Sequence, residues 1–413
     1  MLRWERDRKR QSLSNDHLMT MKVLLLSSYS RRIWRIAVLS FAVALPIAAV
    51  AAPNQRPTPA DVLSIMERVA DWQLAHPSAH LTTDWTQAAG DAGMTALAGI
   101  ASDPKYRDAL LAMGEANGWK PGPRLYHADD LAIGQTYAGL YFLYRDPKMI
   151  APLRSRLDAI LSVPSNAESL DFHQPYDQAS QLWSWCDSLF MAPPVWMQVY
   201  AATGDERYLD FAVKNWWRTT DYLYDPSEHL YFRDSTYFDR REANGKKIFW
   251  SRGNGWVMAG LVRILQLLPT NHPSRARFER LFREMAETIL GDQQPDGLWR
   301  SSLLDPASYP LKESSGSGFY TYALAWGEEF ATETATLPKL TQKELVTPSD
   351  EGLPPVANLL TITPAEAGKP FLYYLGAGWS KSGDFATETD WEDYVQQFVA
   401  WLHAPLQVNL KNK

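Results

Sequence analysis

Cysteine and histidine are scarce in this chain of 413 residues. The single cysteine, Cys186, excludes an internal disulfide and a cysteine-cluster metal site. The 8 histidines include no HExxH pattern, so we expect neither a metal nor another cofactor. The net charge of -6 argues against a nucleic-acid partner, because such a partner requires a basic surface. We therefore expect any chemistry to rest on ordinary acid–base side chains.

Long apolar runs are also scarce, and only residues 36–52 form one of note. The run follows three arginines and ends in the small residues Ala49-Val50-Ala51, as signal-peptidase sites do. We expect residues 1–51 to be a signal peptide and the mature protein to be periplasmic or secreted. An uncleaved membrane anchor is the alternative, but the run is short for one and Pro46 interrupts it. After cleavage, no contact with a membrane is expected.

Alternating valine and isoleucine are nearly absent, so few strands are expected, whereas apolar residues recur at helical spacing throughout the chain. Related aspartate-led stretches near 103, 146 and 205 each open such a helix, which is typical of tandem helical hairpins. Hairpins of this kind form an open solenoid or a closed toroid, so the predicted class is all-α. The predicted helices cover about 59–75, 86–100, 104–117, 130–145, 149–162, 177–203, 206–222, 254–268, 274–290, 315–329 and 390–402.

The last part of the chain has a different character. We place a catalytic domain at 52–330, followed by an atypical segment at 331–413 that joins a loop-rich connector to the helix at 390–402. Many threonines and prolines, and few regularly spaced apolar residues, distinguish this connector. Residues 231–238 read as a short strand or ordered loop, and Asn244-Gly245 as a tight turn.

Two stretches carry carboxylates suited to acid–base chemistry. Asp187 stands among tryptophans, a cysteine and apolar residues, and such surroundings raise a carboxyl pKa until it can serve as a general acid. The alternative is a carboxylate on the solvated edge of a helix. Asp129 and Asp130 are adjacent acids before an apolar helix, where capping explains at least one of them equally well.

A third stretch, residues 250–257, places Arg252, Asn254 and Trp256 around two glycines. Glycine allows close approach of the backbone to a ligand, and the guanidinium matches a carboxylate. The indole offers a flat face to a sugar ring, and the chain holds 17 Trp in all. A turn that opens a helix is the alternative explanation. Together, the three stretches suit an acidic sugar handled without a metal.

These stretches resemble those of glycoside hydrolase family 105, the unsaturated rhamnogalacturonyl hydrolases and their relatives. The resemblance implies an (α/α)6 barrel, in which six helical hairpins close into a ring. It also implies removal of a terminal 4,5-unsaturated uronic acid from oligosaccharides that a polysaccharide lyase has cut. It covers about 60–328 and rests on Asp129-Asp-Leu-Ala-Ile-Gly-Gln-Thr-Tyr137, Trp185-Cys-Asp-Ser-Leu-Phe-Met-Ala-Pro193, Trp250-Ser-Arg-Gly-Asn-Gly-Trp256, Gln294-Pro-Asp-Gly-Leu-Trp299 and Glu313-Ser-Ser-Gly-Ser-Gly318.

The resemblance also implies roles for single residues. Asp187 matches the acid/base that hydrates the vinyl ether, and Asp129 matches the second aspartate, with Asp130 as its substitute. Because the helical pattern stops after about residue 330, we expect an atypical or incomplete sixth hairpin. Substrate-binding positions are implied for Trp185, Arg252, Asn254, Trp256, Asp130 and, near a histidine of some relatives, Arg233.

Two other functions remain open at this point. One is a different helical-toroid glycosidase, which would use two carboxylates on saturated sugar ends. The other is a carbohydrate-binding protein without catalysis, which would keep only the aromatic subsites.

Overall fold

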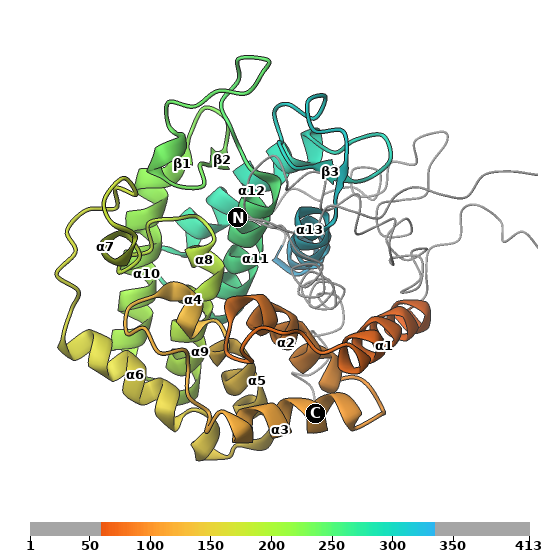
Figure 1. Ribbon diagram of the computed structural model, residues 1–413, viewed down its shortest axis with the longest axis vertical. Coiled ribbons are helices and arrows are strands. Elements are labelled where there is room, and N and C mark those ends of the chain that lie inside the picture. Colours follow the sequence, from red (N-terminus) through yellow and green to blue (C-terminus); the bar gives the residue numbers. More distant parts are fainter. Residues whose placement is uncertain (1–58, 335–413) are drawn as a thin grey trace, which may run out of the picture. The chain divides into compact units, whose positions relative to one another are not determined.

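The computed structural model describes residues 59–334, and helices dominate this part of the chain (Figure 1). The predicted all-α class is confirmed, and the ten long helices follow the predicted apolar periodicity. They are α1 Pro59–Ala75, α2 Trp85–Ala98, α3 Lys105–Ala116, α5 Gly134–Tyr144, α6 Ala151–Ser162, α9 Pro193–Thr203, α10 Glu206–Leu223, α11 Ser251–Leu267, α12 Arg275–Gly291 and α13 Ser314–Thr334.

The remaining elements are short and lie in the connections. Three one-turn helices, α4 Ala128–Leu131, α7 Tyr176–Ala179 and α8 Ser188–Met191, accompany two 3-10 turns, η1 Pro147–Met149 and η2 Ser235–Tyr237. Two antiparallel ribbons complete the inventory, with Tyr224 opposite Tyr231 in the first and Trp299 opposite Glu313 in the second. The first pairs β1 Tyr224–Asp225 with β2 Leu230–Tyr231, and the second pairs β3 Trp299–Arg300 with β4 Lys312–Glu313.

The long helices alternate between an inner and an outer position. The inner helices α2, α5, α9, α11 and α13 contact one another in chain order, while α3, α10 and α12 pack on inner helices from outside (Figure 1). Burial follows the same division: 14 of the 17 residues of α11 are buried, against 6 of the 17 residues of α12. A helix that is apolar all round needs neighbours on every side, whereas an amphipathic helix needs one covered face.

The core lies between these two sets of helices. Large aromatic side chains join them, since Trp196 of α9 lies 6.0 Å from Tyr208 of α10, and Trp216 of α10 lies 5.6 Å from Phe278 of α12, between ring centroids. All four side chains are fully buried. Many of the aromatic side chains therefore pack in the core, and only the others can line a binding site.

Two of the predicted helices are wrong as single elements. The stretch 130–145 is divided into α4 and α5, and the stretch 177–203 is divided into α7, an irregular run at 180–187, α8 and α9. In the second case Pro193 and Pro194 occupy the first turn of α9, where proline is tolerated because those N–H groups have no helical acceptor. The periodicity continued across these breaks because the irregular run is buried too.

Other local predictions are confirmed. Gly245 has a φ of 81° and its N–H bonds to the carbonyl of Glu242, as a tight turn requires. The stretch 231–238 begins in β2 and continues through the turn η2. The expected boundary at 330 falls within α13, and the signal peptide, the connector beyond 334 and the helix at 390–402 lie outside the described residues.

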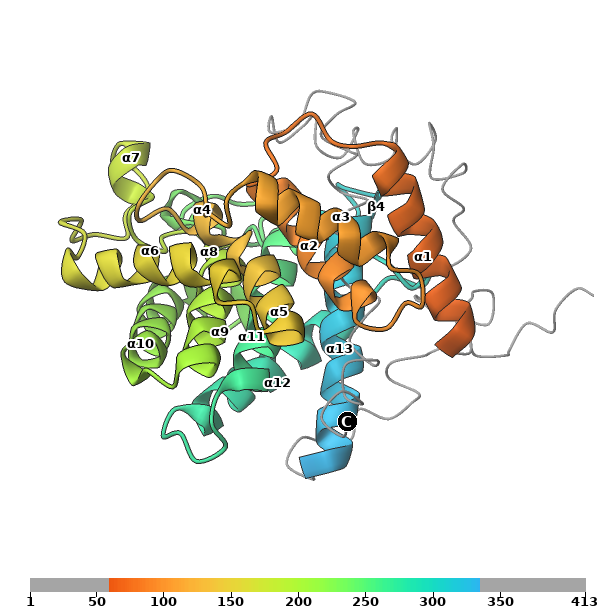
Figure 2. The ribbon, with the colours of Figure 1, turned by 90° about the horizontal axis from the view of Figure 1, so that it is seen from below.

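The short helices collect at one end of the long ones. Figure 2 shows α4, α7 and α8 toward the upper end of this view and α12 toward the lower end. Asp129 lies in α4, Asp187 caps α8, and Arg252 is the second residue of α11. All three residues therefore sit at junctions between a loop and a helix. Within residues 59–334, no helix is long and apolar enough to cross a membrane.

Candidate active site

One pocket brings together most of the predicted site residues. It has a volume of about 240 Å³ and receives side chains from α2, α4, α7, α8, the loops beside them and the start of α11. Asp129, Asp187, Trp185, Arg233 and Arg252 all line it. Their positions in the sequence span more than 120 residues, so only the ring of helices brings them together.

Asp187 is held at the start of α8 by a short structured loop. Its backbone carbonyl accepts from the N–H of Phe190 at 2.9 Å, and the thiol of Cys186 donates to its Oδ1 at 3.1 Å. The N–H of Cys186 bonds to the carbonyl of Arg233 at 2.8 Å, which ties this loop to the segment after β2. Burial raises the pKa of Asp187, while the charges of Arg233 and Arg252 and the Cys186 thiol act in the opposite direction.

Asp129 is the second carboxyl group of the pocket. Burial, together with the charge of Asp187, raises its pKa from 3.8 to about 8. The ionised form of Asp187 thus favours the protonated form of Asp129, so the two carboxyl groups lose their protons in two separate steps. The pocket therefore holds at least one protonated carboxyl group at neutral pH, which is what general acid catalysis requires.

The His127 side chain forms hydrogen bonds with the backbone of Asp129 and with Tyr176. Burial and the charge of Arg124 lower its pKa to about 4, so the imidazole is neutral. Its Nδ1 accepts from the backbone N–H of Asp129 at 3.3 Å, and Nε2 therefore carries the hydrogen that it donates to the hydroxyl of Tyr176 at 2.8 Å. This bond connects α7 to α4 and leaves the Tyr176 hydrogen available to another acceptor.

Asp130 has a different environment from its neighbour. It is buried and accepts from the backbone N–H and the guanidinium of Arg124, with Nε at 3.0 Å. Its backbone carbonyl also accepts from the N–H of Gly122 at 2.8 Å, and it does not line the pocket. The role implied for Asp130 in substrate binding is wrong for this geometry, because its carboxylate is already engaged in holding the loop before α4.

The two arginines differ in how far they reach into the pocket. The Arg233 side chain is 34% exposed and donates to buried Asp234 at 2.9 Å. Arg252 is only 2% exposed, and its guanidinium lies 4.2 Å from the Trp250 ring centroid. Arg252 therefore supplies positive charge from within the wall, while Arg233 is placed to touch a ligand.

The expected roles of Asn254 and Trp256 are corrected by their burial. Trp256 is fully buried and packs against Phe190 at 4.8 Å and Phe319 at 4.3 Å, between ring centroids, so it offers no face to a sugar. The amide of Asn254 accepts from the N–H of Tyr231 at 2.7 Å and donates to its carbonyl at 3.1 Å. Asn254 thus holds β2 in place instead of contacting a ligand.

The two glycines beside Asn254 also serve packing. A Cβ on Gly253 would lie 2.8 Å from the sulfur of Cys186, and one on Gly255 would lie 2.8 Å from the ring of Phe319. Without side chains here, the start of α11 lies directly against the loop that carries Asp187. The close approach predicted from the glycines is therefore an approach between protein segments.

Several residues of the pocket were not predicted to bind substrate. They are aromatic or apolar and surround the carboxyl pair: Trp85, Phe172, Tyr176, Met191 and Trp250. Met191 and Trp250 lie within quoted motifs, so their place was signalled even though no role was assigned. Phe172 lies in the loop before α7 and Tyr176 is the first residue of that one-turn helix, and no sequence pattern marks either of them because their contacts depend on the path of the chain.

A further buried carboxyl group, that of Glu313, interacts with the positive charge of Arg252 in the wall of the site. The carboxyl group of Glu313 is buried and accepts from the hydroxyl of Ser315 and the N–H of Gly316. Burial raises its pKa, whereas the Ser315 bond and the positive charge of Arg252 lower it.

His76 and His80, which are four residues apart, belong to no cluster of His, Cys, Asp and Glu that could hold a metal within residues 59–334.

A ring of helices with paired carboxyl groups, guanidinium groups and aromatic walls at one end defines a helical-barrel glycosidase. The family model of Glycosyl Hydrolase Family 88 matches residues 62–345. This chain belongs to that family, in agreement with the predicted group of glycosidases. A second model, a domain of unknown function named DUF4861, matches residues 321–408.

Individual relatives agree with this assignment. The unsaturated 3S-rhamnoglycuronyl hydrolase of Formosa agariphila is 41% identical over 276 residues, or 63% of this chain and 72% of that protein. A structure of a family 88 glycosyl hydrolase from Bacteroides vulgatus has a TM-score of 0.61 at 23% identity, covering 84% of this chain and 99% of the other. A structure named a polysaccharide lyase has a TM-score of 0.62 at 26% identity, covering 86% and 98%. The predicted six-hairpin barrel fold is confirmed.

Proposed function

We propose that this enzyme removes a terminal 4,5-unsaturated uronic acid from oligosaccharides that a polysaccharide lyase has produced. The observation that carries the proposal is the pair of carboxyl groups with raised pKa values, Asp187 and Asp129, in a pocket that also holds two arginines. The Formosa agariphila relative, named an unsaturated rhamnoglycuronyl hydrolase, supports the same reaction.

The proposed chemistry is hydration of a vinyl ether. Protonated Asp187 donates its proton to C4 of the double bond, and the positive charge that develops at C5 is spread to the ring oxygen. Asp187, now ionised, accepts a proton from the water that attacks C5. The resulting hemiketal opens to a keto acid and releases the next sugar, so the net change is the addition of one water. One carboxyl group thus acts as acid and then as base.

Asp129 has a supporting role in this proposal. Burial and the charge of Asp187 raise its pKa to about 8, so the two carboxyl groups together still hold a proton at neutral pH. Arg233, which is partly exposed in the pocket, is placed to bind the substrate carboxylate through its guanidinium. Trp185, Trp250 and Tyr176 provide faces for the sugar rings.

The sugar next to the uronate is proposed to be rhamnose, with or without sulfate. The choice of rhamnose rests on the name of the relative, because no sequence pattern in the loops that would contact that sugar predicts its identity. Unsaturated disaccharides from pectin, ulvan and glycosaminoglycan digestion separate the possibilities. Preference for a rhamnose-containing disaccharide would support the proposal, and preference for an amino-sugar disaccharide would contradict it.

Ultraviolet absorbance tests the reaction directly, because the conjugated double bond absorbs and its hydration abolishes the absorbance. We expect absorbance to fall on adding the enzyme to unsaturated disaccharide. A polysaccharide lyase, the activity named for one structural neighbour, would instead make absorbance rise on intact polysaccharide. Stable absorbance with release of sugar from saturated ends would favour the other helical-toroid glycosidase.

Asp187→Asn separates catalysis from binding. We expect turnover to fall by roughly 10²–10⁴-fold while the unsaturated disaccharide still binds, because the amide keeps the shape of the pocket but cannot donate a carboxyl proton. Asp210→Asn is the matched control, since Asp210 is exposed on α10 and lies outside the pocket. Binding without turnover in the unchanged protein would point to a carbohydrate-binding protein instead.

We further propose that the enzyme is exported, on the strength of the charged, apolar and small-residue order of residues 1–51. Sequencing the amino terminus of protein recovered from the periplasm or the medium tests this. A new terminus near Ala52 is expected, and a chain that stays in the cytoplasm with residues 1–51 attached would contradict export.

A further inference from the structure

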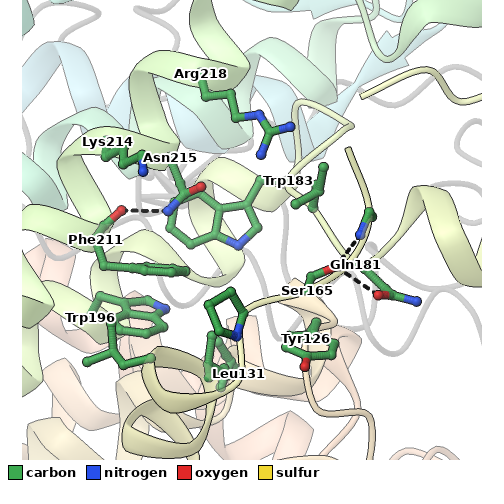
Figure 3. A pocket seen from close by; sticks show the side chains of 15 residues that line it. Tyr126, Leu131, Ser165, Gln181, Trp183, Trp196, Phe211, Lys214, Asn215 and Arg218 are labelled. Carbon is green, nitrogen blue, oxygen red and sulfur yellow. Dashed lines mark hydrogen bonds between the residues drawn. The ribbon is translucent and has the colours of Figure 1, made fainter. Parts of the chain in front are cut away.

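A second pocket lies beside the loop that ends at the candidate active site. We call it the outer pocket; it has a volume of about 260 Å³ and is bounded by α4, α6, α9, α10 and residues 164–183 (Figure 3). No described residue lines both pockets. Trp183 faces the outer pocket and Trp185, two residues on, lines the active site, so one irregular stretch of chain serves both.

The floor of the outer pocket is aromatic. The rings of Trp196 and Phe211 stack with centroids 3.9 Å apart, and Trp183 meets Phe211 edge-on at 5.9 Å (Figure 3). Phe211 is only partly buried, which leaves part of its ring facing the pocket. The volume falls below the roughly 300–1,000 Å³ typical of pockets for drug-sized ligands, so the occupant would be about one sugar ring. Aromatic faces of this kind suit the C–H faces of such a ring.

The mouth of the outer pocket is positively charged. Lys214 and Arg218 lie one helical turn apart on α10, with Asn215 between them (Figure 3). Lys214 is exposed, and Arg218 uses one amino group to donate to the carbonyl of Glu168 at 2.7 Å. None of the described residues that line this pocket is acidic, although the whole chain has a net charge of -6. The local charge therefore complements an anion.

A buried donor points to a ligand with oxygen atoms. The Trp196 side chain is fully buried, and its Nε1–H has no hydrogen-bond partner among residues 59–334. In Figure 3 this nitrogen lies on the edge of the indole that faces the middle of the pocket. The indole N–H groups of Trp119, Trp216 and Trp217 also lack a partner among residues 59–334, but of the four only Trp196 lines the outer pocket, where a ligand can supply the acceptor.

We propose that the outer pocket binds one anionic sugar residue that carries a sulfate or a carboxylate. The acid group lies at Lys214 and Arg218, the ring rests on Trp183 and Phe211, and a ring or hydroxyl oxygen accepts from Trp196. The choice of a sugar as the body of the anion rests on the proposed function, because lyase products and their parent polysaccharides supply such residues. Charge, aromatic floor and orphan donor all favour this class over an uncharged ligand.

Occupancy of the outer pocket would also steady the active-site loop. The side chain of Gln181 accepts from the hydroxyl of Ser165 at 2.8 Å and donates to the carbonyl of Asp177 at 3.1 Å. Asp177 follows Tyr176, whose side chain lines the active site. The wall of the outer pocket is thus hydrogen-bonded to the helix that carries an active-site residue.

The indole N–H signal of Trp196 provides a direct test. The full chain is labelled with ¹⁵N-tryptophan, the signal is assigned with Trp196→Phe, and three saturated probes are titrated: rhamnose 3-sulfate, glucuronate and rhamnose. We expect a saturable shift with at least one anionic sugar and little with rhamnose. Lys214→Glu should weaken this binding by at least about tenfold, because it replaces an attractive charge by a repulsive one.

Lys120→Glu is the matched control, since Lys120 is exposed and lines neither pocket. Sodium sulfate is the second control. If sulfate alone shifts Trp196 as strongly as the sugars, only an adventitious ion binds and the proposal is overturned. If no probe shifts the Trp196 signal, or if Lys214→Glu binds the anionic sugar with unchanged affinity, the proposal is also overturned. The stronger of the two anionic sugars identifies the acid group.

Hydrolysis of unsaturated disaccharide is followed on the same variants, so the two proposals fail separately. A silent Trp196 in a protein that still destroys the double bond refutes the outer pocket alone. An intact Trp196 response in a protein without turnover refutes the proposed function alone. Lys214→Glu should keep its turnover on a disaccharide that is too short to reach both pockets, and its circular dichroism should match the unchanged protein.

Discussion

Asp129→Asn should stabilise the protein against unfolding, and increasingly so as the pH rises. The folded protein holds the Asp129 proton until about pH 8, whereas the unfolded chain loses it near the ordinary pKa of 3.8. Between these values the folded state binds more protons than the unfolded state, so the stability of the unchanged protein falls as pH rises through this window. Asparagine does not titrate, so the variant escapes that loss.

The magnitude follows from the pKa of the carboxyl group. A rise from 3.8 to about 8 corresponds to roughly 6 kcal/mol at about 1.4 kcal/mol per pH unit. The Asp129 side chain is 16% exposed to the pocket, so water there solvates part of the ionised group. We therefore expect about 2–3 kcal/mol of stabilisation at pH 9, or an increase in Tm of about 4–8 °C, and little difference at pH 4.

Thermal unfolding followed by circular dichroism at a series of pH values measures this effect. Asp130→Asn is the neighbouring control and should have the opposite sign, because it removes the charged acceptor that buried Asp130 offers to half-exposed Arg124 and destabilises the protein by about 1–3 kcal/mol. Parallel curves of Tm against pH for Asp129→Asn and the unchanged protein would refute the reasoning. Such curves would mean that Asp129 is ionised at neutral pH and does not share protons with Asp187.

Three further predictions concern residues around the pocket. Trp256→Ala should lower the free energy of unfolding by about 3–5 kcal/mol in denaturant titration, whereas Trp250→Ala should mainly raise KM, because only Trp250 lines the pocket. Asn254→Ala should cost about 2–4 kcal/mol by the same measurement, since β2 loses both of its amide partners. Cys186→Ala should move the alkaline limb of the kcat/KM pH profile upward, because Asp187 loses a donor that favours its ionised form; a downward shift would contradict this.

The sequence was most informative about helices and about the residues of single motifs. Apolar spacing located α1, α10 and α12 to within about a residue, because an amphipathic helix must show its buried face in its own sequence. It failed at residues 180–187, where irregular backbone carries the buried side chains of Trp183, Trp185 and Cys186 without being helical. Periodicity reports burial, and it cannot say which backbone conformation is buried.

The roles of Trp256 and Asn254 show a second limit of prediction from the sequence. Both residues belong to the same short motif as Arg252, and chemistry alone made each a plausible ligand contact. Only packing separates them: Trp256 faces Phe190 and Phe319 inside the barrel, Asn254 clamps the backbone of Tyr231, and the edge of Arg252 reaches the pocket. A motif fixes which residues lie together but not which of them face the solvent.

By itself, the sequence determined the all-α class, the alternation of helices and the chemical character of Asp187, because these depend on neighbours in the chain. Only the tertiary structure decided that Asp129 shares the pocket while Asp130 turns away to Arg124. The ring also brought Tyr176 and Trp85 to the same pocket from the starts of two helices distant in the sequence. The physical reason is that burial and charge coupling depend on distances between segments, and those distances are set by how the helices pack.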